Sequence, residues 1–172
     1  MIHGAPNSSP ENIDARGMRV AVVGTEWNAD VVDMLIARAV ETGEAAGAQV
    51  QVFTVSGAME LPLIAQAASK RFDAVVALGC VIRGETPHFD YVCRAVTDGL
   101  TRVALDMSVP VGNGVLTVDT YEQALARTGG PDAREDKGAE ALTAAIGAAN
   151  VMREIERFPL MKLTHGDAHD AW

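Results

Sequence analysis

The chain contains little cysteine and no cysteine-pairing motif. Among its 172 residues there are two cysteines, Cys80 and Cys93, and neither a CxxC pair nor any spacing typical of a metal site is present. A disulfide framework and a cysteine-based metal centre are therefore not indicated. We expect two reduced thiols in the protein core, as is usual for cytoplasmic proteins.

Positive charge and long hydrophobic runs are also scarce. The chain has 14 lysine and arginine residues against 23 acidic ones, a formal net charge of −9. A general nucleic-acid binder needs clustered basic side chains, so that function is not supported. No apolar run reaches the roughly 20 residues that span a bilayer, and the first residues lack the pattern of a signal peptide. We expect a cytoplasmic protein with a small-molecule ligand, and neither nucleic acid nor membrane as partner.

Nucleotide-binding glycine motifs are missing as well. Gly24, Gly79 and Gly84 do not form a G-x-G-x-x-G fingerprint, and no G-x-x-x-x-G-K-[ST] motif occurs. A dinucleotide or nucleoside triphosphate is therefore poorly supported as the ligand.

What the chain does have is a regular alternation of strand and helix patterns. We predict strands over 18–24, 50–55, 74–78 and 111–118, and helices over 29–46, 58–70, 87–105, 120–127 and about 137–157. This alternation predicts a three-layer α/β/α fold with a four-stranded parallel sheet. We expect a single domain over residues 18–158, between a flexible N-terminal tail (1–17) and a C-terminal tail (159–172).

Polar residues follow the first three predicted strands. They are residues 25–28, 56–60 and 83–88. In parallel sheets, ligands bind beyond the carboxyl ends of the strands. We therefore expect these three loops to converge on one ligand site.

The third loop carries the clearest chemistry. Its Thr86-Pro87 pair is typical of a helix start and predicts Thr86 as the cap and Pro87 as the first helical residue. The free backbone N–H groups of such a helix start favour an anion such as phosphate. His88 would then lie in the first turn as a general acid or base, although a lone histidine can also be structural or solvated.

Residues in the first two loops have both a functional and a structural interpretation. Trp27 could stack on a heteroaromatic ring or cover the edge of the core. Asn28 is expected to cap the following helix. Glu60 could accept hydrogen bonds from substrate hydroxyls, or be favoured at a helix start by the helix dipole alone.

The basic candidates are equally open from sequence alone. Arg83 could bind a phosphate or anchor its loop through a carboxylate. Arg127 could bind a phosphate or simply complement the end of a helix. Lys137 stands in a charged helix start that is usually just solvated.

Taken together, these residues resemble the lumazine synthase family over about residues 20–157. The most specific stretches are residues 77–92, 112–117 and 136–138. The resemblance implies a flavodoxin-like fold and a transferase of riboflavin synthesis. Enzymes of this family condense 5-amino-6-ribitylaminouracil with 3,4-dihydroxy-2-butanone 4-phosphate. The reaction proceeds through an imine, phosphate elimination and ring closure, without cofactor or metal.

The resemblance also implies which residues act on the substrates. Those expected to hold the pyrimidine and its ribityl chain follow the first three strands: Trp27, Asn28, Ala58, Met59, Glu60, Cys80, Val81 and Ile82. The phosphate would be bound by the turn of Glu85 and Thr86 and by Arg127. His88 takes the position of proton transfer.

A homo-oligomer is implied by where the remaining site residues stand. Asn113, Arg127 and Lys137 should not reach the loops of their own chain, and the family shares each site between neighbouring subunits of a pentamer. Residues 128–134 form a longer loop with a proline, which favours a free pentamer or a decamer over a 60-subunit shell. An N-terminal strand exchanged with a neighbouring subunit could extend the sheet.

The chain departs from the family pattern at three positions. Ser56 replaces a common proline, Asn113 replaces an aromatic residue, and Glu85 adds a carboxylate beside the phosphate turn, so that contacts there should come from backbone N–H groups. Two alternatives to the enzyme stay open, a non-catalytic protein that binds flavins or lumazines and a mainly structural shell subunit. His88 and Arg127 favour catalysis.

Overall fold

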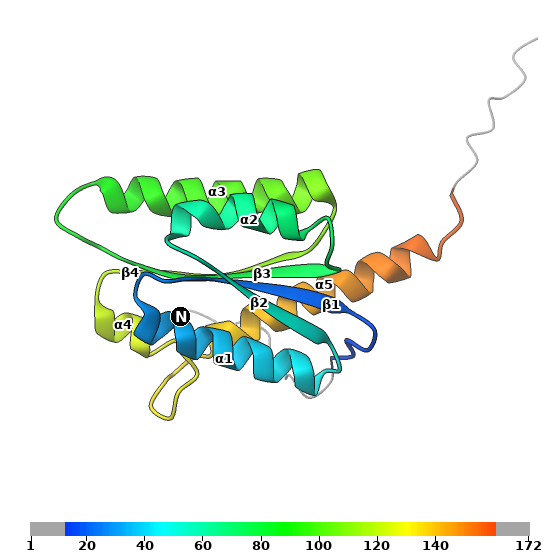
Figure 1. Ribbon diagram of the computed structural model, residues 1–172, viewed down its shortest axis with the longest axis horizontal. Coiled ribbons are helices and arrows are strands. Elements are labelled where there is room, and N and C mark those ends of the chain that lie inside the picture. The colour runs from blue at the N-terminus through cyan, green and yellow to red at the C-terminus, as the bar shows by residue number, and fades with distance from the viewer. Residues whose placement is uncertain (1–12, 161–172) are drawn as a thin grey trace, which may run out of the picture.

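Strands alternate with helices along the chain (Figure 1). The computed structural model describes residues 13–160. The strands are β1 (Arg19–Thr25), β2 (Gln49–Val55), β3 (Ala74–Ile82) and β4 (Val111–Val118). The helical elements are α1 (Ala29–Ala45), the short 3-10 helix η2 (Ala58–Glu60), α2 (Leu61–Ala68), α3 (His88–Met107), α4 (Tyr121–Leu125) and α5 (Lys137–Glu156).

The four strands form one parallel sheet in the order β2-β1-β3-β4. Helices α1 and α5 cover one face and α2 and α3 cover the other (Figure 1). The predicted three-layer α/β/α fold is therefore confirmed.

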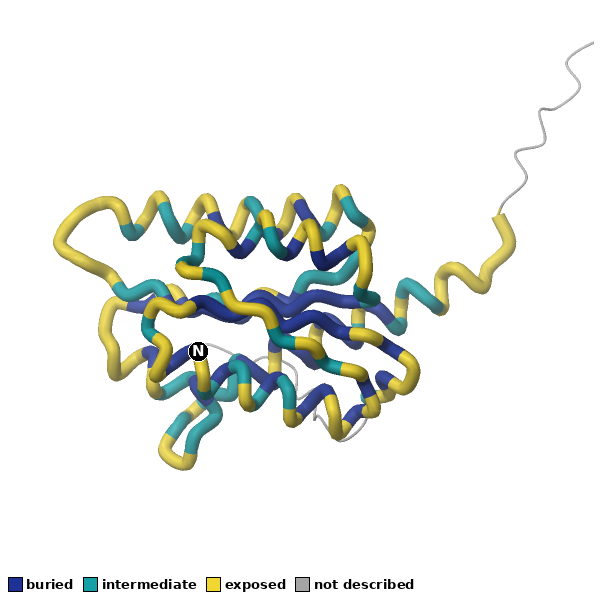
Figure 2. Tube along the Cα trace, in the orientation of Figure 1, coloured by how far each residue is buried: buried dark blue, intermediate teal, exposed yellow. Residues whose placement is uncertain are grey.

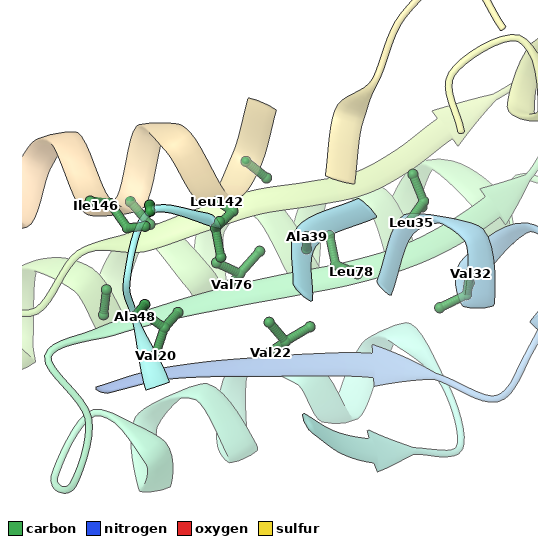
Figure 3. Close-up of a cluster of buried hydrophobic side chains, with 14 of the residues drawn as sticks. Val20, Val22, Val32, Leu35, Ala39, Ala48, Val76, Leu78, Leu142 and Ile146 are labelled. Atoms are coloured by element: carbon green, nitrogen blue, oxygen red, sulfur yellow. The ribbon is translucent and has the colours of Figure 1, made fainter. Parts of the chain in front are cut away.

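The two central strands, β1 and β3, are buried on both faces (Figure 2). Successive side chains point to opposite faces, so Val20 and Val22 join the core under α1 and α5, while Ala21 and Val23 join the core under α2 and α3. Figure 3 shows the first core, in which strand valines lie beside Leu142 of α5. Strands buried on both faces need continuous apolar runs, which is why their pattern is so clear in the sequence.

The third strand is longer than predicted. We expected it to end at residue 78, before Gly79, but β3 continues to Ile82 because β4 pairs with it as far as Val118. Cys80, Val81 and Ile82 are thus strand residues and not loop residues. The glycine indicated a loop locally, but pairing with β4 outweighed it. The helix expected over 58–70 is divided into η2 and α2.

The segment before β1 is packed against the domain. Ala15 is fully buried, and its N–H donates to the carbonyl of Ala46 at 2.8 Å. The side chain of Asn150 donates to the carbonyl of Asp14 at 2.9 Å. The expected loose tail is therefore wrong for residues 13–17, while residues 1–12 and 161–172 lie outside the described residues. Within 13–160 no helix is long and apolar enough to cross a membrane.

Close packing between α1 and α5 predicts opposite effects for two glycine substitutions in α5. A Cβ on Gly138 would overlap the backbone carbonyl of Leu35, whereas a Cβ on Gly147 meets nothing within 4 Å. We expect Gly138→Ala to lower the free energy of unfolding by about 2 kcal/mol, because overpacking outweighs the helix preference of alanine.

Gly147→Ala is the matched control, and it should raise the free energy of unfolding by up to about 1 kcal/mol. Urea unfolding of the wild type and both variants at one fixed protein concentration measures the two changes in the free energy of unfolding. Equal effects of the two substitutions would contradict the packing described for α1 and α5.

Candidate active site

A pocket of about 440 Å³ opens at the carboxyl ends of β1, β2 and β3. Its walls come from the first two of the loops expected from the sequence, from the end of β3 and from the start of α3: Trp27, Asn28, Gly57, Ala58, Met59, Glu60, Cys80, Val81, Ile82, His88 and Val92. Of the third expected loop, residues 83–88, His88 alone lines the pocket. The chain order reverses between β1 and β3, and parallel sheets bind their ligands at such a point.

Asn28 connects the ends of β1 and β3. Its Nδ2 donates to the carbonyl oxygen of Cys80 at 2.8 Å, and its backbone has a positive φ of 56°, which asparagine tolerates better than most residues. Asn28 does occupy the cap position of α1, but its side chain makes no capping bond. Asn28 is thus the predicted cap residue of α1, but it caps through its backbone carbonyl, because its side chain satisfies a carbonyl at the end of β3.

The turn held by Asn28 presents Trp27 to solvent. Trp27 is 72% exposed, so it does not cover the edge of the core. Its backbone N–H donates to the carbonyl of Ser56 at 3.2 Å, which ties the turn after β1 to the turn after β2. A fixed backbone with an exposed indole is well suited to stacking on a planar ligand.

Glu60 has a structural role at the pocket wall. Its Oε2 accepts the backbone N–H of Gly57 at 2.9 Å and so closes the start of η2. Only Oε2 is hydrogen-bonded within the described part of the chain. A Cβ on Gly57 would lie 3.2 Å from this oxygen and 3.9 Å from Cδ1 of Trp27, so the three residues form one compact wall.

Cys80 lines the pocket, and the residue is only 4% exposed. Burial, with a smaller contribution from Asp30, raises its pKa to about 11. The group is therefore a neutral thiol at pH 7 and a poor nucleophile. Both cysteines are free, as expected, but Cys93 is only partly buried.

The start of α3 differs by one residue from the sequence prediction. Pro87 occupies the cap position with φ −61° and ψ −7°, and no side chain caps the helix. Thr86 is therefore not the cap, because the helix begins at His88 and Pro87 already has helical backbone angles. His88 is the first helical residue and faces the pocket together with Val92, one turn further on. Val92 was missed, although its i+4 spacing from His88 could have indicated it.

Several predicted residues do not line this pocket. Glu85 and Thr86 lie exposed in the neighbouring loop. Asn113 belongs to the edge strand β4, where its Oδ1 accepts the N–H of Val115 at 3.0 Å.

Arg127 and Lys137 form a separate cluster around Glu135. Nζ of Lys137 lies 2.7 Å from that carboxylate, and the Arg127 guanidinium lies 3.6 Å from it. The ion pair raises the pKa of Lys137 and lowers that of Glu135. Both cations are thus positioned together, outside the pocket of their own chain.

The fold defines a flavodoxin-like α/β protein, and its pocket lies at the reversal point of the sheet. The sequence matches the family 6,7-dimethyl-8-ribityllumazine synthase over residues 17–153. The chain belongs to this family, as the sequence motifs indicated.

Relatives described as 6,7-dimethyl-8-ribityllumazine synthase share more than half of the aligned residues. The protein of Corynebacterium jeikeium is 59% identical over 143 residues, which cover 83% of this chain and 89% of the relative. That of Corynebacterium kroppenstedtii is 53% identical over 152 residues, 88% and 96% of the two chains. That of Thermobifida fusca is 54% identical over 144 residues, 83% and 85% of the two chains.

The raised pKa of Cys80 predicts that its alkylation is slow at neutral pH. The thiolate is the reactive form, and with a pKa of about 11 its fraction grows only as the pH approaches that value. We expect iodoacetamide to label Cys80 in the folded protein at pH 7.5 at least 10-fold more slowly than in the protein unfolded in urea. Peptide mass spectrometry measures both rates, and equal rates would contradict a buried neutral thiol.

Proposed function

We propose that the chain catalyses the condensation of 5-amino-6-ribitylaminouracil with 3,4-dihydroxy-2-butanone 4-phosphate to 6,7-dimethyl-8-ribityllumazine, with release of phosphate and water. Membership of the lumazine synthase family and the names of its relatives support this transferase reaction of riboflavin synthesis. The observation that carries the proposal is the pocket that joins Trp27, Glu60 and His88.

The pyrimidine would bind on the side of β1 and β2. The exposed indole of Trp27 offers a stacking surface, and Glu60 offers a carboxylate held in place by Gly57. The end of β3 adds an apolar wall with backbone groups at Val81 and Ile82. These contacts suit a flat ring with polar edges.

The sugar phosphate would bind at the start of α3. The N-terminus of this 20-residue helix favours an anion, and the loop of Glu85 and Thr86 leads directly into it. His88 is the first residue of this helix and lines the pocket, where it can transfer protons during imine formation and ring closure. Because no covalent bond to the protein is needed, holding two reactants together supplies most of the rate, and proton transfer adds about 10²–10⁴-fold.

Arg127, Lys137 and Asn113 would complete the site of a neighbouring subunit in a homopentamer. This assignment is supported by their distance from the pocket of their own chain and by the clustering of both cations around Glu135. The loop over residues 128–134 extends away from the sheet (Figure 1) and supports a free pentamer or decamer over a closed shell. We propose that the enzyme is cytoplasmic and that residues 18–158, with residues 13–17 packed against them, form its catalytic domain.

Turnover tests the proposed reaction directly. With both substrates, the wild type should form lumazine, followed by absorbance and fluorescence, well above the spontaneous rate. Arg127→Ala should lower kcat/KM for the sugar phosphate by about 10²-fold, because a charge-assisted contact to phosphate is lost. Background turnover in the wild type, combined with tight binding of lumazine or riboflavin, would instead indicate a non-catalytic binding protein.

Mixed oligomers test whether sites are shared between subunits. Ala58→Trp should fill the pocket, and Arg127→Ala should remove the cation, so each variant alone should be nearly inactive. The two variants are then mixed in equal amounts, unfolded and refolded together. If each site takes its pocket from one subunit and Arg127 from the next, about a quarter of the sites should have both intact residues and regain activity. Each variant refolded alone is the control, and no recovery in mixed oligomers of normal size would contradict shared sites.

A further inference from the structure

Arg83 is the first residue after β3 and contacts three parts of the structure. Its backbone N–H donates to the carbonyl of Val118 at 2.9 Å, which extends the pairing of β3 with β4. Its Nε donates to Oδ1 of Asp119 at 2.8 Å, and its Nη1 donates to the Asp90 carboxylate at 3.3 Å. The guanidinium carbon also lies 4.1 Å from the centre of the Phe89 ring.

These contacts hold both ends of the loop that leads to His88. The loop over residues 84–87 is exposed, and a Cβ on Gly84 would meet no atom within 4 Å, so the loop has little packing of its own. The backbone of Arg83 fixes its beginning on β4. The side chain of Arg83 fixes its end, because Phe89 and Asp90 belong to the first turn of α3.

Asp119 is itself firmly placed. Its backbone N–H donates to Oε1 of Gln123 at 2.8 Å, while the N–H of Gln123 donates to the hydroxyl of Thr120, the cap of α4. The carboxylate that receives Arg83 is therefore attached to a capped helix and not to a free loop.

The charges around Arg83 argue against a direct role as a phosphate ligand. Two carboxylates, those of Asp90 and Asp119, face its one guanidinium, so the cluster as a whole does not attract an anion. The hydrogen bond to Asp119 is also the main reason that the pKa of Arg83 is raised. Of the two interpretations open from sequence, the structure favours the loop anchor.

We propose that Arg83 is a positioning residue that sets the place of the Glu85–Thr86 turn and of His88 for the phosphate-bearing substrate. This inference rests on the proposed function. Exposed ion pairs contribute little to folding stability. A displacement of about 1 Å at a reacting group, however, can lower a rate by about 10²-fold.

The first test compares Arg83→Met with the wild type for each substrate. We expect kcat/KM for the sugar phosphate to fall by about 10–100-fold, with KM for the pyrimidine changed by less than about two-fold. Arg102→Met is the matched control, since it breaks the ion pair of Arg102 with Asp106 on α3 and should leave both values unchanged. Equal loss for both substrates, or none, would overturn the proposal.

Asp119→Asn separates positioning from direct binding. If Arg83 bound the phosphate itself, removing a nearby negative charge would strengthen that binding. If Arg83 acts through its contact with Asp119, Asp119→Asn weakens phosphate binding. Adding Arg83→Met to that variant then causes little further loss. Arg83→Lys should also fail to restore activity, because lysine lacks the planar fork that reaches both carboxylates and stacks on Phe89.

Binding of inorganic phosphate gives a readout that does not depend on turnover. Calorimetric titration of the wild type, Arg83→Met and Asp119→Asn should show weaker binding in both variants, while urea unfolding and oligomer size stay as in the wild type. If the wild type binds phosphate but shows no turnover, the proposed reaction is refuted. The phosphate affinities of the two variants would then still decide the role of Arg83. Unchanged phosphate affinity in both variants would overturn the role of Arg83.

Discussion

The pairing of β1 with β3 is the constraint on which the rest of the structure depends. Both strands are buried on both faces, so a shift of one residue would turn every side chain toward the wrong core. Because their register is fixed, the residues that follow them meet at defined places. Beyond the paired residues, the hydrogen bond from Asn28 to the carbonyl of Cys80 holds the turn that carries Trp27 at the pocket.

Two pocket residues illustrate how the site is preorganised. Asn28 and Glu60 both use a side-chain polar atom to satisfy a backbone group, the carbonyl of Cys80 and the N–H of Gly57. Each side chain is therefore held in one orientation before a ligand arrives. Such fixed polar groups lower the ordering entropy that binding has to overcome.

The sequence predicted the architecture better than the details of the site. Apolar runs such as residues 74–78 indicate buried strands because both sheet faces are covered, and the turns after β1 and β2 meet at the pocket as the parallel order requires. The end of β3 depends on pairing with β4, so Gly79 misled a local interpretation. The side-chain bond of Asn28 likewise depends on Cys80, a residue distant in the chain. The start of α3 at His88 depends on the backbone angles of Pro87. Periodicity and capping rules do not contain that information.

The contact between α1 and α5 has a consequence for synthesis of the chain on the ribosome. Arg38 of α1 pairs with Asp136 at 2.7 Å, and Leu35 packs against Gly138, although about a hundred residues separate the two helices in sequence. Until α5 has left the ribosome, the valines of β1 under α1 have only part of their cover. The nascent chain therefore carries an open apolar face for most of its translation, which is the condition under which chaperones engage a growing protein.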